Sequence, residues 1–83
     1  MSDPVSWYLI EPGWKVSSVD GEHLGHITEV DAETELDIFN GIEYRQVVFE
    51  QPRYVPSEHV ERIVEGEVTL SLTAEQAERL GPR

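Results

Sequence analysis

The sequence predicts a mainly β fold, a small and strongly bent antiparallel β-barrel of about five to six strands with one helical turn and a short C-terminal helix. Three observations lead to this class. Turn-forming pairs recur at short intervals, apolar residues alternate between them, and the 83-residue length fits a single small domain. We expect one domain over 1–83, made of an N-terminal apolar segment (1–12), a barrel (13–72) and a short helix (73–81).

The first hairpin is predicted at Asp20-Gly21, because hairpin turns need the positive φ that these residues tolerate. Strands are expected over residues 14–19 and 23–30. Two registers remain open. A two-residue loop pairs Val16 with Gly25, whereas a three-residue loop pairs Val16 with Leu24, and a slip of one residue inverts which side chains are buried. The apolar spacing after the turn fits neither alternation, so we expect a bulge near Gly25.

Four further elements complete the predicted barrel. We expect an acidic loop over 31–41 that ends in the turn pair Asn40-Gly41, a strand over 42–50, a short strand over 53–55 and a last strand over 68–72. Between the last two, Pro56 opens a predicted helical turn in which Val60 and Ile63 point inward. Gly66 ends that turn.

The C-terminal residues have the pattern of a capped helix. Thr73 is followed three residues later by Gln76, which is the form of a capping box, and Gly81-Pro82 is a stop signal. A helix of about two turns is not stable alone. We therefore expect it to pack on the barrel or on a second subunit.

Charge limits the partners of this protein. The formal net charge is -11, from 17 acidic and six basic side chains. Such a surface repels nucleic acid and anionic membranes, so we expect neither as a partner, while a basic protein is electrostatically suitable. The absence of cysteine and of a signal-like start favours a cytoplasmic location.

No pattern of an enzyme is present. No serine lies in a nucleophile motif, and no glycine-rich loop precedes a Lys-Ser/Thr pair. A barrel of this size is filled by its own side chains and leaves little room for a substrate. We predict no enzymatic activity, no catalytic residues and no cofactor.

Two groups of residues raise the question of a metal. Asp31, Glu33 and Glu35 have the spacing that begins an EF-hand loop, but the sixth position is leucine and the twelfth is isoleucine. The three histidines are His23, His26 and His59. On an unbulged strand the first two point to opposite faces, although a bulge at Gly25 could bring them together. We predict no metal site and keep a small-ligand or divalent-metal-binding regulatory domain as an alternative function.

The apolar N-terminal stretch is the candidate interface, with Trp7, Tyr8, Leu9 and Ile10 as its residues. These side chains either cap the open end of the barrel or contact a partner, since large aromatic side chains supply much of the energy of protein interfaces. Pairing of an exposed edge strand across a two-fold axis is the simplest form of such contact, and we expect a homodimer.

The order and spacing of several short motifs resemble the PRC-barrel family, which includes the barrel of the photosynthetic reaction centre H subunit and that of a ribosome maturation factor. The motifs are Gly13-Trp14-x-Val16, Asp20-Gly21, Leu24-Gly25-x-Ile27-x-x-Val30, Tyr54-Val55-Pro56 with Val60 and Ile63, and Val68-x-Leu70. The resemblance implies a small bent β-barrel that docks proteins, often within dimers, and it carries no catalytic motif.

Together these observations predict a non-enzymatic, self-associating protein-interaction or docking module. A second alternative to that role is an adaptor like the ribosome maturation factor, which would have to bind a basic ribosomal protein because the acidic surface repels RNA.

Overall fold

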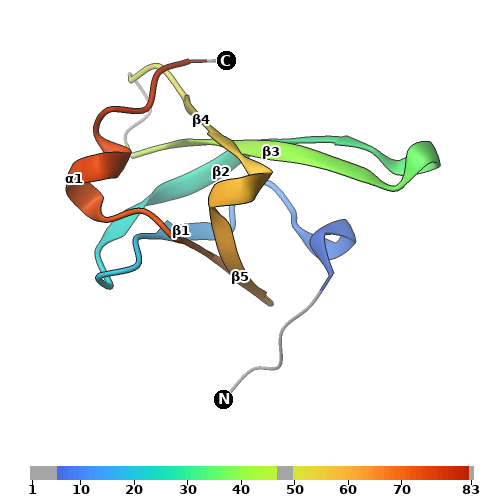
Figure 1. The fold of residues 1–83 in the computed structure, drawn as a ribbon, viewed down its shortest axis with the longest axis horizontal. Helices are drawn as coiled ribbons and strands as arrows, with labels where there is room; N and C mark the ends of the chain where they lie inside the picture. Colours follow the sequence, from blue (N-terminus) through green and yellow to red (C-terminus); the bar gives the residue numbers. More distant parts are fainter. Residues whose placement is uncertain (1–5, 47–49, 83) are drawn as a thin grey trace.

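A single curled sheet of six strands forms most of the protein (Figure 1), which confirms the predicted fold class. The computed structural model describes residues 6–46 and 50–82. The strands are β1 (Lys15–Ser17), β2 (His23–Glu33), β3 (Ile38–Arg45), β4 (Arg53–Pro56), β5 (Val60–Val64) and β6 (Glu67–Leu70). The short helices are the 3₁₀ turns η1 (Trp7–Leu9), η2 (Thr34–Leu36) and η3 (Ser57–His59), and the α-helix α1 (Ala74–Ala77).

The order of the strands in the sheet is β4-β3-β2-β1-β6-β5. Neighbouring strands are antiparallel except β1 and β6, which run parallel. The prediction of antiparallel pairing therefore holds for all the described pairs but this one. None of the helices in the described part of the chain has the length and apolar character needed to cross a bilayer.

The connection between the two edge strands forces the sheet to curl. β4 and β5 lie at opposite ends of the strand order, yet only the three residues of η3 separate them in the chain. In a flat six-stranded sheet the edges would be about 24 Å apart. A 3₁₀ turn rises only about 2 Å per residue, so the short connection is compatible only with edges that have come together. Figure 1 shows η3 leading directly from one edge strand to the other.

The inner face of the curled sheet holds a small hydrophobic core. The buried side chains in it come from five strands and from the segment before β1: Ile10, Val16, Ile27, Ile42, Tyr44, Val55, Val68 and Leu70. Partly buried residues, including Val60 and Ile63 of β5, pack around this cluster. A chain of this length buries only a modest fraction of its surface, so we expect polar contacts outside the core to stabilise the fold as well.

The first hairpin uses both of the registers that the sequence left open. Next to the turn, the amide of Ser18 donates to the carbonyl of Glu22, which encloses a three-residue loop. Farther along, Val16 lies opposite Gly25, as a two-residue loop would have placed it. Leu24 is the extra residue that joins the two registers. The predicted bulge near Gly25 is thus confirmed.

The predicted loop over 31–41 is wrong in extent. β2 continues to Glu33, η2 makes the turn, and Asp37 closes it in the left-handed conformation with φ 56°. Asn40-Gly41 is not a turn but part of β3, where Asn40 is the unpaired residue of a bulge. A Cβ on Gly41 would overlap the carbonyl of Val55, so this glycine permits close approach of β4.

The turn predicted after Pro56 is shorter than expected. η3 is present, but the residues from Val60 onward form strand β5, with no helical turn that lasts to Gly66. The spacing of Val60 and Ile63 is explained by a bulge at Glu61, since Val60 lies opposite Leu70 and Arg62 opposite Thr69. The extra residue places side chains three apart on the same face of a strand.

Strand boundaries also differ from the predicted ones at other places. β1 is shorter than the predicted 14–19, and β6 ends at Leu70 where 68–72 was expected. β3 begins earlier than predicted and ends at Arg45, and the part of that prediction over 47–49 lies outside the described residues. β4 matches its predicted position with one residue added.

The C-terminal helix has the predicted capping box, but α1 covers only Ala74–Ala77 of the predicted 73–81. The Thr73 hydroxyl accepts from the amide of Gln76, and the Gln76 side chain accepts from the amide of Thr73. Polar contacts fix both ends of α1 to the sheet. At its start, the Ala74 amide donates to the carboxylate of Asp20. At its end, Nη1 of Arg53 donates to the carbonyls of Ala77, Glu78 and Leu80.

Gly25→Ala should lower the free energy of unfolding by about 3 kcal/mol or more, because φ is +153° there and a Cβ would overlap the carbonyl of Arg45. Gly21→Ala is the matched control. Its φ is +87° but nothing lies within 4 Å of the added carbon, so only the backbone cost of about 1 kcal/mol is expected. Urea unfolding followed by circular dichroism measures both. Equal losses would contradict a contact at Gly25.

Asp20→Ala should lower the melting temperature at neutral pH. The Ser18 hydroxyl, followed by the Ala74 amide, holds the pKa of Asp20 below its usual value of 3.8. A depressed pKa stabilises the fold above the unfolded-state value, and this stabilisation is lost as the pH falls through the folded-state value. The difference in melting temperature between the two proteins should therefore shrink below about pH 3.8. Glu65→Ala, at an exposed position, controls for relief of general charge repulsion.

Candidate interaction surface

The segment before β1 is a 3₁₀ turn, which corrects the expectation of an edge strand there. The hydroxyl of Ser6 accepts from the Tyr8 amide, and the amides of Leu9 and Ile10 donate to the carbonyls of Ser6 and Trp7. These local bonds occupy the backbone groups that a neighbouring strand would need. Val5, at the start of the stretch, lies outside the described residues.

The four predicted interface residues divide between core and surface. Ile10 is 6% exposed and belongs to the core, so it offers little area to a partner. Trp7 is partly buried and packs against the core. Tyr8 and Leu9 are 51% and 56% exposed. Trp7 and Ile10 therefore cover the core, as one interpretation of the sequence predicts. Tyr8 and Leu9 are exposed and available to a partner, as the other interpretation predicts.

Aromatic stacking joins η1 to the hairpin made by β2 and β3. The rings of Trp7 and Phe39 stack with centroids 5.6 Å apart, and Tyr8 also stacks on Trp7, at 4.1 Å. The Tyr8 hydroxyl donates to the carbonyl of Thr34, 3.1 Å away. Desolvation and then the nearby carboxylate of Asp37 raise the pKa of Tyr8, which keeps the hydroxyl protonated as a donor.

The far part of this hairpin extends away from the rest of the sheet, with η1 beneath it (Figure 1). We call residues 30–39 the arm. Its end carries Leu36 and Ile38, which are 65% and 42% exposed. Of the five large exposed apolar side chains among the described residues, four therefore lie on η1 or on the arm, and the fifth is Val19. We call Tyr8, Leu9, Leu36 and Ile38 the arm surface.

The arm also has a strand edge without a strand partner. The ladder between β3 and β4 covers Gly41 to Tyr44 of β3. Within the described residues, Ile38, Phe39 and Asn40 have no strand on the side away from β2. These three residues are uncharged, whereas Glu33 of β2 lies opposite Ile38 and the same strand carries Glu29 and Asp31 farther along. Edge strands in soluble proteins are commonly protected by charge, and this one is not.

The histidines do not converge with other ligands. The bulge at Leu24 brings His23 and His26 together as the sequence allowed, with ring centroids 5.1 Å apart and edges against faces. Nε2 of His23 lies 3.1 Å from the carbonyl of Gly25. His59 lies on η3, 3.9 Å from the carboxylate of Glu58. Over residues 6–46 and 50–82, no three histidine, aspartate or glutamate side chains are grouped to hold a metal ion.

The acidic residues considered for calcium lie on the arm. Asp31 and Glu33 are at the end of β2 and Glu35 is in η2. The carboxylate of Asp31 accepts a hydrogen bond from the hydroxyl of Tyr54 at 2.9 Å, which ties the base of the arm to β4. At least one of these carboxylates thus has a structural role.

Tyr8 and Leu9 of the arm surface are among the predicted interface residues, whereas Leu36 and Ile38 are not, because the sequence predicts an acidic loop there. The signal that could have found them is the apolar group Leu36-Asp37-Ile38-Phe39 inside a charged stretch. Its proximity to Trp7 depends on a contact between residues more than thirty positions apart, which no local pattern reveals.

Comparison with known proteins gives one informative match. No curated protein matches the chain in a sequence search. Residues 10–78, which include all six strands and α1, match the family described as "Uncharacterized protein conserved in bacteria (DUF2171)". The chain belongs to this bacterial family.

Proposed function

We propose that this protein is a non-enzymatic interaction module that self-associates through the arm surface and the free edge of β3. The observation that carries the proposal is the concentration of exposed apolar side chains on η1 and the arm. The chain has a net charge of -11 and a small core, yet four large apolar side chains are exposed to water in one region. Such a group of exposed apolar side chains is typical of a protein–protein interface.

The arrangement is fixed before any partner binds. Stacking of Trp7 on Phe39, together with the hydrogen bond from Tyr8 to Thr34, ties η1 to the arm. A surface that is already ordered loses less conformational entropy on association. This supports a docking role rather than a flexible tail.

A second copy of this chain is the partner that the free edge favours. Two identical strand edges pair antiparallel across a two-fold axis, and the residues that would face each other, Ile38 to Asn40, carry no charge. The acidic residues elsewhere on the arm repel a second copy, so association should be stronger when salt screens them. A basic protein partner would show the reverse dependence on salt.

The resemblance to PRC-barrels supports the same role. That family's modules are small bent barrels that dock proteins, often in dimers, and the curled six-stranded sheet of this protein is of the kind the resemblance implies. Membership of the PRC-barrel family is itself part of the proposal.

Light scattering on a sizing column tests self-association. We expect about twice the 9.5 kDa of one chain, with a larger dimer fraction at about 0.5 M salt than at low salt. Ile38→Lys should convert the protein to a monomer, because it places a charge on the edge that pairs. This change also reduces the net negative charge, so loss of the dimer could not be ascribed to greater repulsion.

Val19→Lys is the control, since Val19 is 46% exposed, apolar and outside the arm surface, and the charge change is identical. It should remain dimeric. The proposed interface is contradicted if the wild-type protein is a monomer at all salt concentrations. It is also contradicted if both variants lose the dimer equally while circular dichroism shows that their fold is intact.

A further inference from the structure

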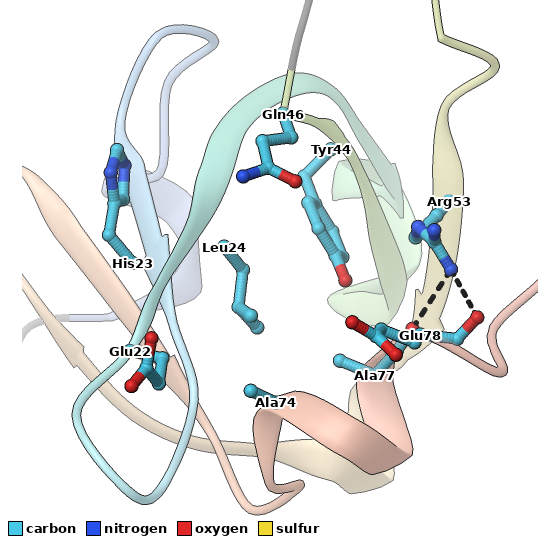
Figure 2. Close-up of a pocket in the computed structure, with 9 residues that line it drawn as sticks. All are labelled: Glu22, His23, Leu24, Tyr44, Gln46, Arg53, Ala74, Ala77 and Glu78. Carbon is cyan, nitrogen blue, oxygen red and sulfur yellow. Dashed lines mark hydrogen bonds between the residues drawn. The ribbon is translucent and has the colours of Figure 1, made fainter.

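A small polar pocket lies between α1 and strands β2 to β4. Its volume is about 140 Å³. Leu24, Ala74 and Ala77 supply apolar walls, and Tyr44, Gln46, Arg53, Glu22, His23 and Glu78 complete the lining (Figure 2). None of these residues belongs to the arm surface.

The pocket contains the hydroxyl group of an otherwise buried tyrosine, and this hydroxyl is accessible from the pocket. Tyr44 is only 2% exposed, and Figure 2 shows its side chain pointing from β3 toward α1 with the hydroxyl inside the pocket. Among the described residues nothing hydrogen-bonds to this hydroxyl. A polar group in such a position normally has a protein or water partner, because leaving it unpaired is unfavourable. The hydroxyl is therefore available to a molecule in the pocket.

Charges of both signs surround that hydroxyl. Arg53 uses Nη1 for the carbonyls at the end of α1, drawn as dashed lines in Figure 2, which leaves Nη2 and Nε without a partner among the described residues. The carboxylate of Glu78, on the same side of the pocket as Tyr44 and Arg53 in Figure 2, likewise has no ion pair or hydrogen bond to a described residue and is exposed to solvent. Burial raises the pKa of Tyr44, and the positive charge of Arg53 opposes this rise.

We propose that this pocket binds a small zwitterion of the amino-acid class, with its carboxylate at the Tyr44 hydroxyl and the free nitrogens of Arg53 and its ammonium group at the carboxylate of Glu78. A simple anion is repelled by the net charge of -11, and a simple cation leaves Arg53 unpaired. A zwitterion carries no net charge and satisfies both sets of groups.

The size of the pocket limits the ligand. A cavity of about 150 Å³ holds a molecule of about six heavy atoms, which is the size of alanine. A ligand this small binds weakly, and we expect a dissociation constant of the order of 1 mM. The inference does not depend on self-association, since the arm surface and the pocket share no residue.

Titration of the ¹⁵N-labelled full chain with L-alanine, followed by amide shifts in NMR, tests this site. We expect saturable shifts at Leu24, Gln46, Ala74 and Ala77 as alanine rises to about 20 mM. Acetate and methylammonium, which present one charged group each, should bind at least about tenfold more weakly. Equal binding of either fragment would overturn the zwitterion assignment, and absence of saturable shifts with alanine would overturn the site.

Two substitutions test separately whether the Tyr44 hydroxyl and the Glu78 carboxylate contribute to alanine binding. Tyr44→Phe removes one oxygen and Glu78→Gln one charge, and each should weaken alanine binding about tenfold. Glu75→Gln is the matched control, because Glu75 is on the same helix but faces Arg79, 3.5 Å away, outside the pocket. It should bind as the wild type does. Glu78 is exposed, so its variant tests the proposal even if Tyr44→Phe does not fold. Unchanged binding in the Glu78 variant contradicts the proposal.

Discussion

The short connection between the two edge strands is the constraint on which the rest of the structure depends. Because η3 joins β4 to β5 with three residues, the six-stranded sheet has to curl until its ends approach each other. The curl creates an inner face small enough for the few core side chains to fill. It also sets the parallel pairing of β1 with β6, which brings the two halves of the chain together.

Bulges absorb the bending that this closure requires. In the described ladders an extra residue interrupts the pairing at Leu24, Thr28, Asn40 and Glu61. Each extra residue bends its strand and increases the local twist. The bulges also redirect side chains. They place His23 beside His26 and turn Val60 and Ile63 to one face, so the same features that close the sheet decide which residues meet.

The modest core explains why polar contacts fix the parts that lie around it. Asp20 and Arg53 hold the two ends of α1, and Tyr54 holds the base of the arm through Asp31. Since α1 is attached at its ends, space remains beneath it for the pocket at Tyr44. The arm, in contrast, extends past the core and keeps its apolar side chains at the surface.

Features that depend on neighbouring residues can be predicted from the amino-acid sequence alone. The β class, the turn at Asp20-Gly21 and the capped C-terminal helix follow from glycine conformations, alternation and the pairing of Thr73 with Gln76, all of which act within a few positions. Both hairpin registers that the sequence allows occur in the structure, because each applies to one side of the bulge at Leu24.

Features that depend on contacts between distant residues follow from the folded chain and not from any local pattern. The i, i+3 spacing of Val60 and Ile63 suits a helix or a bulged strand equally, and pairing with β6 selected the strand. The same holds for the arm surface and for the pocket, where Arg53 meets the end of α1 about 25 positions away. Such contacts are chosen by closure of the sheet, and local propensity contains no information about them.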